Sequence, residues 1–309
     1  MKLTIVTTLY QSSPYIDEFH RRASDVARTL VDEDYEIIFV NDGSPDNSID
    51  KAVQLTERDS HVVVVDLSRN FGHHKAMMTG LAHAIGDRVF LIDSDLEEDL
   101  EWLLSFSEQM DQETCDVVYG VQENRKGGWF ERWSGELYYR AFNLLVNIQH
   151  PRNITTARLM TRRYLDALLL HREREIVISG LWVITGFEQH PQTVMKKSTS
   201  PTTYSVLYKF SHLVNVITSF SSKPLITIFF VGLTVFVGSL TYALYLIVNR
   251  LFFSIPLDGW TSIMASIWLL GGVNISFIGV IGIYLSKVYS ESKQRPYVIT
   301  KAIYGKSKS

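Results

Sequence analysis

The spacing of hydrophobic residues along the first part of the chain predicts alternating strands and helices. Short apolar runs predict strands at Leu3–Thr8, Tyr35–Val40, His61–Leu67, Arg88–Ile92 and Val117–Tyr119. Between them, apolar residues recur at helical spacing in Ser13–Val31, in the segment that ends at Arg58, and in His73–Ile85. Strands that alternate with helices are typical of βαβ units and a mostly parallel sheet, so we expect an α/β fold.

Two long apolar segments near the C-terminus have a different character. Leu225–Val248 and Trp260–Leu285 contain no Lys, Arg, Asp or Glu. Each exceeds the about 20 apolar residues that a helix needs to cross a bilayer. A soluble core could bury one such helix, but two in tandem predict a transmembrane helical hairpin.

These patterns predict four parts in the chain. They are an α/β domain over 1–203, an amphipathic juxtamembrane segment over 204–224, the hairpin over 225–286 and a basic tail over 287–309. Two further segments, Tyr138–Ile148 and Tyr204–Phe220, carry apolar residues near helical spacing. We expect the first to pack on the sheet and the second to lie in the membrane interface.

The charges that flank the hairpin predict its orientation. Basic residues lie before the first span and after the second, at Lys209, Lys223, Lys287, Lys293, Arg295 and Lys301. The connecting segment Asn249–Gly259 has only Arg250, offset by Asp258. Because basic residues favour the cytoplasmic side, we expect a multi-pass protein of the plasma (inner) membrane with its α/β domain and both termini in the cytoplasm.

Composition narrows the classes of function. The formal net charge of -3 is unlike that of a nucleic-acid-binding domain, which is usually basic. The single cysteine, Cys115, excludes an internal disulfide and fits a reducing compartment. Neither a dinucleotide-binding glycine motif nor a P-loop occurs in the sequence.

The residues that could bind ligands or a metal lie where predicted strands end. Tyr10–Ser13, Asp42–Asn47 and Asp93–Glu97 each follow a strand, and ligands of open α/β sheets bind at the carboxyl ends of strands. In Asp93-Ser94-Asp95, two carboxylates one residue apart suit Mg²⁺ or Mn²⁺, and magnesium typically takes one or two carboxylates together with substrate phosphates. Glu97 either supports this metal site or begins an acidic helix N-terminus.

Several motifs together resemble a known family. Val40–Ser44, Ser68–His73 and Asp93–Glu97, in this order and spacing, resemble the family 2 glycosyltransferases with a GT-A fold, which is a Rossmann-like, mostly parallel sheet domain. Later segments look like the polyprenyl-phosphate glycosyltransferases of the dolichol-phosphate mannose synthase kind, in the bacterial branch with two C-terminal helices. These segments are Arg158–Met160, Ile217–Ser221, Lys223–Leu225 and Gly282–Leu285. The resemblance spans nearly the whole chain.

The resemblance implies inverting transfer of a sugar from a nucleotide-sugar, with UDP favoured, to an undecaprenyl-type polyprenyl phosphate. Tyr10 and Asp42 would lie at the nucleotide base, and Asp93 and Asp95 at the metal-bound diphosphate, with Asp95 as a catalytic residue. Three cations are candidates for neutralising the two anionic substrates: Arg125, Arg158 and Lys197. Arg158 lies within a matched motif and is expected to be catalytic, whereas Arg125 and Lys197 are expected to bind substrate. Arg69 and His73 lie in the Ser68–His73 motif, and for them a structural role is an alternative to a role in the site.

The chain also departs from the family pattern. Glu97 replaces a Gln, Tyr10-Gln11-Ser12 replaces a Tyr-Asn-Glu motif, and Gln122 and Thr203 replace basic residues. Thr155-Thr156-Ala157 replaces a Gly-Asp-aromatic segment, so an acidic residue is missing. A phosphate monoester has a second pKa of about 6. A lipid phosphate therefore attacks as an anion without a general base, and the loss is compatible with activity.

Other functions stay open. A catalytically silent membrane scaffold would explain the departures, although Asp42, Asp93 and Asp95 are retained. A processive polysaccharide synthase would need a Gln before Arg132-Trp133 and more spans to enclose a pore. A transporter component would be expected to carry ionisable residues in its spans. Small residues in the second span suit packing within the hairpin or a homo-oligomer: Gly271, Gly272, Gly279 and Gly282.

Overall fold

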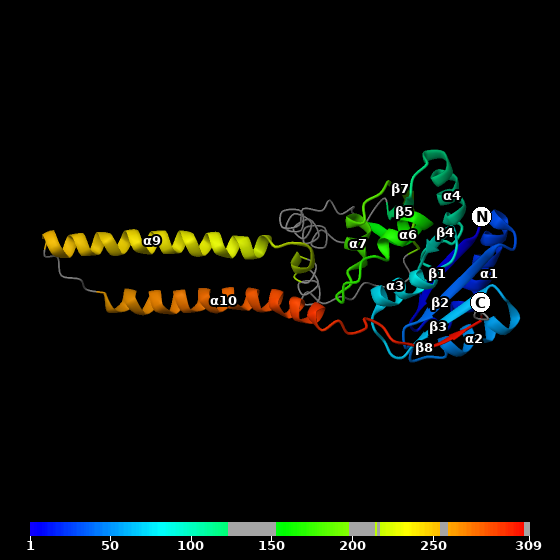
Figure 1. Ribbon diagram of the computed structural model, residues 1–309, viewed down its shortest axis with the longest axis horizontal. Coiled ribbons are helices and arrows are strands. Elements are labelled where there is room, and N and C mark those ends of the chain that lie inside the picture. The colour runs from blue at the N-terminus through cyan, green and yellow to red at the C-terminus, as the bar shows by residue number, and fades with distance from the viewer. Residues whose placement is uncertain (123–152, 198–213, 215–216, 254–258, 306–309) are drawn as a thin grey trace. The chain divides into compact units, whose positions relative to one another are not determined.

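The structure is a computed structural model of the 309-residue chain, and it describes residues 1–122, 153–197, 214, 217–253 and 259–305. The chain forms two compact units (Figure 1). The first contains residues 1–135, 148–205 and 294–309, and the second contains 136–147 and 206–293. The segment Tyr138–Ile148 and most of Tyr204–Phe220 lie outside the described residues.

The first unit is built on an eight-stranded sheet. Its strands are β1 (Leu3–Leu9), β2 (Tyr35–Asn41), β3 (Val62–Leu67), β4 (Arg88–Leu91), β5 (Val117–Gln122), β6 (Ile154–Thr161), β7 (Gln189–Val194) and β8 (Thr300–Tyr304). Its helices are α1 (Ile16–Val31), α2 (Ser48–Arg58), α3 (His73–His83), α4 (Trp102–Glu113), α6 (Arg162–Leu168) and α7 (Ile178–Ile184). The predicted α/β class is confirmed, and each of the five predicted strands is present.

The order of the strands brings the predicted site segments to one edge of the sheet. The order is β7-β5-β6-β4-β1-β2-β3-β8. Strands β4, β1, β2 and β3 are parallel, while β6 runs antiparallel between β4 and β5. The carboxyl ends of β1, β2 and β4 are therefore neighbours, which is where open α/β sheets bind ligands.

Alternate residues of each strand face two different layers of helices. On one face, α1 and α4 contribute Phe19 and Phe106, whose rings pack edge-on against Phe39 of β2 at 5.7 Å and Phe90 of β4 at 6.1 Å. On the other face, α3 contacts β1 and β2 through Gly80. A Cβ there would come within 2.8 Å of side chains of both strands, so only glycine allows this approach. Each face thus buries a continuous apolar layer.

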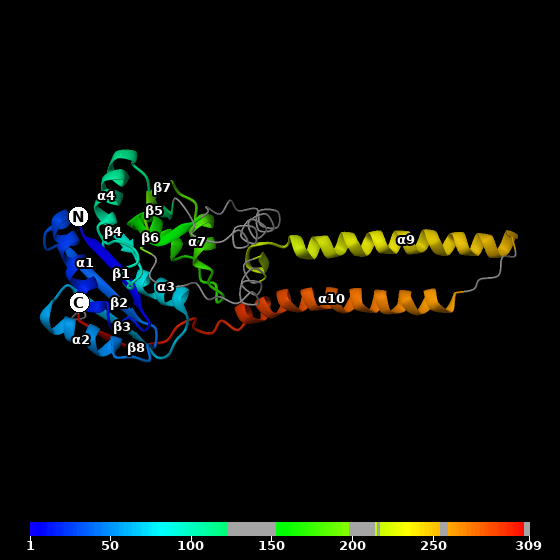
Figure 2. The ribbon, with the colours of Figure 1, turned by 180° about the vertical axis from the view of Figure 1, so that it is seen from behind.

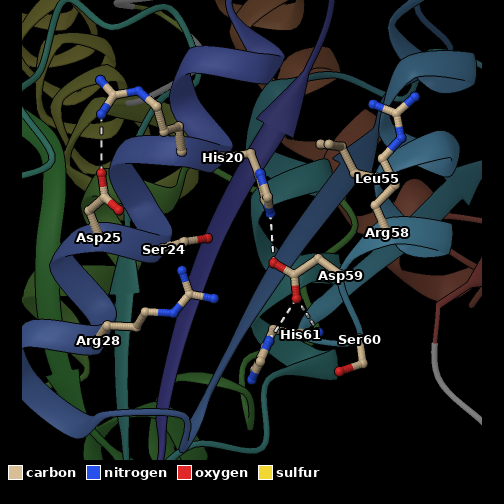
Figure 3. Close-up of a pocket in the computed structure, with 10 residues that line it drawn as sticks. His20, Ser24, Asp25, Arg28, Leu55, Arg58, Asp59, Ser60 and His61 are labelled. Atoms are coloured by element: carbon tan, nitrogen blue, oxygen red, sulfur yellow. Dashed lines mark hydrogen bonds and ion pairs between the residues drawn. The ribbon is translucent and has the colours of Figure 1, made fainter.

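A pocket of about 570 Å³ lies between α1 and the loop that joins α2 to β3 (Figure 3). Asp59 lies between two histidines there, with its Oδ2 2.8 Å from His20 Nε2 and its Oδ1 2.6 Å from His61 Nδ1. The pocket is at the amino end of β3 and is not part of the predicted site. Its hydrogen bonds fasten α1 to the α2–β3 loop.

The sequence predicts a basic tail over 287–309, but the structure divides this segment differently. Helix α10 continues to Ser292, and β8 joins the sheet antiparallel to β3, with Val65 opposite Ile303 and Asp66 opposite Ala302. Lys301 Nζ lies 3.3 Å from Asp66 Oδ2. Figures 1 and 2 show β8 beside β3 in both views. The pairing covers an edge of β3 that would otherwise be open.

The second unit contains two long apolar helices, α9 (Lys223–Phe253) and α10 (Trp260–Ser292), which lie side by side in Figures 1 and 2. The windows Lys223–Tyr242 and Ser266–Ser292 are long and apolar enough to cross a membrane, and neither is buried by protein. The Tyr284 hydroxyl donates to the Ser221 carbonyl at 2.5 Å. This bond links two of the motifs on which the family resemblance depends.

We predict that removal of residues 294–309 lowers the melting temperature of the detergent-purified protein by about 5–10 °C, because the edge of β3 and the buried Asp66 lose their cover. Differential scanning fluorimetry measures the change. Removal of 306–309 alone is the matched control and should cost nothing. Lys301→Ala should have a smaller effect, because Lys301 is itself exposed and the buried Asp66 keeps its hydrogen bond from Asn41. An unchanged melting temperature after the longer deletion would contradict a structural role for β8.

Candidate active site

Asp42 stabilises the turn that connects two sequence motifs. Its buried carboxylate accepts hydrogen bonds from the backbone N–H groups of Phe71 at 2.7 Å and Gly72 at 3.0 Å. Burial raises the pKa of Asp42 above its usual value, although these two bonds oppose the shift. Gly43 has φ +60, and a Cβ there would lie 2.4 Å from Asn70 N. The motifs Val40–Ser44 and Ser68–His73 thus contact each other directly. A role for Asp42 at the nucleotide base stays a prediction.

Asp93 contacts side chains of two other elements, α3 and β6. Its Oδ2 accepts a hydrogen bond from Thr156 Oγ1 at 2.8 Å, and its Oδ1 lies 3.3 Å from His73 Nε2. Burial alone would raise the pKa of Asp93, but its interactions with His73 and Thr156 outweigh burial and lower it. The pKa of His73 is correspondingly raised, because Asp93 outweighs the opposing effect of burial. His73 therefore favours an ionised Asp93.

A backbone N–H group two residues later in the chain fixes the carboxylate of Asp95. Its Oδ1 accepts the N–H of Glu97 at 3.0 Å, and Leu96 between them adopts a left-handed conformation with φ 59. That conformation is uncommon for a residue other than glycine. Burial and the nearby charge of Asp93 raise the pKa of Asp95, while the Glu97 N–H opposes the shift. Two carboxylates that repel each other at a strand end fit a divalent cation with oxygen ligands.

Glu97 differs from this pair. Its carboxylate lies 3.2 Å from Lys196 Nζ. Within the described part of the chain, ligand atoms of Asp93, Asp95 and Glu97 do not gather within 4.8 Å of one another. Metal binding by Asp93, Asp95 and Glu97 therefore stays a prediction.

Glu98 is a residue of this site that the sequence did not single out. Its side chain is 1% exposed. Its Oε1 accepts the N–H of Thr156 at 3.1 Å, and its Oε2 accepts that of Ala157 at 2.8 Å. Burial raises the pKa of Glu98 to about 7. Glu98 therefore fixes the start of β6, from which Thr156 reaches Asp93.

Lys196 is the cation that the structure places beside these carboxylates. Its Nζ lies 3.2 Å from Glu97 and 3.6 Å from Glu98. Burial would lower the pKa of Lys196, but the neighbouring carboxylates raise it. Lys197, which the resemblance favoured, is 62% exposed, and its Nζ donates to Asp99 Oδ1 at 2.6 Å. A role for Lys197 at a substrate phosphate stays a prediction.

The alternation of exposure continues past the end of β7 at Val194, so that Lys196 is less exposed than Lys197. Val194 is buried, Met195 is 80% exposed, Lys196 is half-buried and Lys197 is exposed again. Side chains two residues apart in an extended chain share a face. The sequence Val194-Met195-Lys196-Lys197 does not alternate in polarity, so it held no signal that would have favoured Lys196.

Arg158 lies deeper in the sheet than the sequence suggested. It is 2% exposed, and its guanidinium carbon lies 3.1 Å from the centre of the Trp182 ring. Within the described residues, its Nε and Nη1 have no hydrogen-bond partner. Burial lowers the pKa of Arg158 to about 9. The structure thus places its charge among aromatic rings, and contact with a phosphate stays a prediction.

The other predicted site residues lie at the edge or beyond the described chain. Tyr10 follows β1 and is 51% exposed, so its ring is accessible to a ligand. Arg125 lies outside the described residues, as do Thr202 and Thr203. Arg69 stacks on Phe71, with 4.1 Å from its guanidinium carbon to the ring centre.

Comparison with known proteins assigns the family. Residues 4–169 match the model of Glycosyl transferase family 2. A putative glycosyltransferase of Mycobacterium tuberculosis is 52% identical over 99% of this chain and 89% of its own length. The bactoprenol glucosyl transferase of Shigella phage SfV is 31% identical over 97% of this chain and 98% of its own length.

Solved structures overlap the chain more loosely. A mannosyltransferase from Pyrobaculum calidifontis, in complex with GDP-Man and Mn²⁺, covers 71% of this chain and 63% of its own, with 17% identity and a TM-score of 0.48. The assignment therefore rests on sequence. The chain belongs to glycosyl transferase family 2, and it is a glycosyltransferase with a GT-A-like domain and two apolar C-terminal helices.

We predict that Glu98→Gln lowers the rate of sugar transfer by about 10- to 100-fold, because the amide puts an N–H group against a backbone donor and leaves Lys196 without its buried partner. The assay compares Glu98→Gln, Lys196→Met and the double variant, with melting temperatures measured in parallel. Glu57→Gln, an exposed residue of α2, is the matched control.

If Glu98 and Lys196 act as one unit, the double variant should lose little more than the worse single variant. Additive losses would show that the two side chains act separately. A variant with a normal melting temperature but slow sugar transfer would show that Glu98 acts by positioning Thr156 and not by stabilising the fold.

Proposed function

We propose that this protein transfers a sugar, with inversion, from a nucleotide-sugar to an undecaprenyl-type polyprenyl phosphate at the cytoplasmic face of a membrane. One observation carries the proposal: a single chain joins paired carboxylates at the strand ends to two apolar helices long enough to span a bilayer. A relative that matches nearly the whole chain is named a bactoprenol glucosyl transferase, which supports a lipid acceptor of this class. The family resemblance favours a UDP-sugar as donor.

On the donor side, Asp93 and Asp95 would hold Mg²⁺ or Mn²⁺. Such an ion supplies charge neutralisation for the diphosphate that leaves. His73 and Thr156 orient Asp93 through its two oxygens, and the backbone of Glu97 orients Asp95. The two carboxylates are therefore preorganised before any ligand arrives, which is the condition for effective electrostatic stabilisation.

On the acceptor side, no proton needs to be removed. The Thr156 hydroxyl already donates to Asp93, and a threonine is not a general base near neutral pH. A phosphate monoester with a second pKa of about 6 is largely a dianion at pH 7. Its oxygen attacks the anomeric carbon while the bond to the diphosphate breaks. Lys196 is the described cation best placed to offset negative charge at the carboxylates.

The alternative of a silent scaffold has less support. A scaffold would have no need for a half-buried carboxylate pair fixed by His73, Thr156 and backbone groups, since burying charge is costly. Asp93, Asp95 and Lys196 retain the charge arrangement that phosphate chemistry needs. The described part of the chain has two candidate spans, which does not favour a synthase that would enclose a pore.

The acceptor assay is the direct test. Purified protein receives a radiolabelled nucleotide-sugar and either polyprenyl phosphate or polyprenol, and counts in the organic phase report transfer. We expect transfer to the phosphate alone. Thr156→Ala should change the rate by less than about tenfold, because it removes one hydrogen bond and no base. Equal use of the alcohol would overturn the proposal, since a hydroxyl requires a base.

Asp95→Asn serves as the control variant for this assay. It should insert into membranes and melt near the parent temperature, yet lose most transfer, because one carboxylate can no longer offset the cation. Full activity in that variant would remove the metal assignment while leaving the acceptor assignment intact.

We further propose that the α/β domain and both termini face the cytoplasm, on the strength of the basic residues that flank the hairpin. A cysteine introduced at Ser254 should react with a membrane-impermeant maleimide added to intact cells. One at Ser290 should react only after permeabilisation, and the parent chain reports the background from Cys115. The reverse pattern would place the nucleotide-sugar site outside the cell and end the proposal.

A further inference from the structure

Three potential metal ligands of different chemistry meet at the end of the sheet opposite the candidate active site. Glu113 ends α4, Cys115 directly precedes the strand region of β5, and His190 is the second residue of β7. One ligand atom from each lies within 4.8 Å of the other two. Within the described part of the chain, this is the one group of three such residues that meets that distance.

The spacing of the ligand atoms is close to what a tetrahedral ion needs. Zinc binds sulfur at about 2.3 Å and imidazole nitrogen or carboxylate oxygen at about 2.0–2.2 Å, so neighbouring ligands in a tetrahedral site lie about 3.3–3.8 Å apart. Small side-chain rotations bring atoms within 4.8 Å to that separation. Cys115 is 4% exposed, whereas Glu113 and His190 reach it from the surface. A water molecule would complete a tetrahedral set of four ligands.

Neighbouring residues already orient the two surface ligands. His190 Nε2 lies 3.1 Å from Glu188 Oε1, while His190 Nδ1 faces Glu113 Oε2. The amide of Gln109 donates to the same Glu113 oxygen at 3.0 Å. In metal sites, a ligating imidazole usually donates its other N–H to a carboxylate or carbonyl, which fixes the ring and its tautomer. Glu188 provides that carboxylate.

The backbone beneath the cluster is fixed. The N–H groups of Asp116 and Val117 both donate to the Glu188 carbonyl, at 2.8 and 3.1 Å. Strand β7 pairs with β5 so that His190 lies opposite Val118. These bonds hold the segment after Cys115 beside β7, which carries His190, without any ion.

We propose that Glu113, Cys115 and His190 form a binding site for a borderline-soft divalent cation, with zinc the best match. Thiolate and imidazole ligands select zinc over magnesium, which prefers oxygen. On binding, the Cys115 thiol releases its proton to solvent and sulfur bonds to the metal. The ion would join the C-terminal end of α4 to the edge strand β7. This site is separate from the carboxylate pair at Asp93 and Asp95, which offers only oxygen ligands.

Cobalt(II) gives a direct test, because a thiolate bound to cobalt produces a charge-transfer band in the near ultraviolet that oxygen ligands do not. The full chain is purified in detergent without a histidine tag, treated with chelator and titrated with Co²⁺. We expect one equivalent to produce the band, an excess of Mg²⁺ to leave it, and zinc to displace it. The bound metal should also raise the melting temperature by about 5 °C or more.

Variants identify the ligands. Cys115→Ser should abolish the band, and Glu113→Gln should weaken cobalt binding at least about tenfold while leaving the apo protein folded. His171→Gln, a histidine paired with Glu173 elsewhere on the surface, is the matched control and should bind like the parent. Absence of the band in the parent, or its persistence in Cys115→Ser, would overturn the proposal. Because the readout is spectroscopic, failure here is distinct from failure of the proposed sugar transfer.

Discussion

The register between β4 and β6 is the constraint on which the candidate site depends. The antiparallel ladder sets Leu91 opposite Arg158. Continued by two residues, the same register brings Thr156 to Asp93, where the hydroxyl donates to the carboxylate. Glu98 stabilises this register because its carboxylate accepts hydrogen bonds from two backbone N–H groups of β6. A slip of one residue would turn Thr156 to the other face and remove both contacts.

The electrostatics of the site follow from that geometry. One segment carries four carboxylates, those of Asp93, Asp95, Glu97 and Glu98. Among the described cations, His73 pairs with Asp93, and Lys196 pairs with Glu97 and Glu98. The balance remains negative, which suits a divalent cation. Asp93 keeps a lowered pKa through its partners, whereas burial raises that of Glu98. Neighbouring carboxylates of one loop thus have different roles because their hydrogen-bond partners differ.

The parts of the fold that sequence predicted are those set by local patterning. The first five strands and the motif positions at their ends follow from apolar runs and turn residues, and the two apolar helices follow from length alone. What the sequence did not reveal depends on distant contacts. Strand β8 pairs with an edge of β3, Glu98 is buried where it accepts two N–H groups of β6, and Lys196 lies beside Glu97 and Glu98. Arg158 was singled out from its motif, but its burial against Trp182 depends on packing that no motif records.

The position of β8 has a consequence for how the protein is made. Because β8 follows α10 in the chain, the ribosome synthesises both apolar helices before the strand that covers β3. The last strand can pair with β3 only after both helices have been synthesised. The edge of the sheet therefore closes last. A chain that stalls or is cleaved within the hairpin would retain an open strand edge, which is the kind of surface that aggregates and that quality-control proteases recognise.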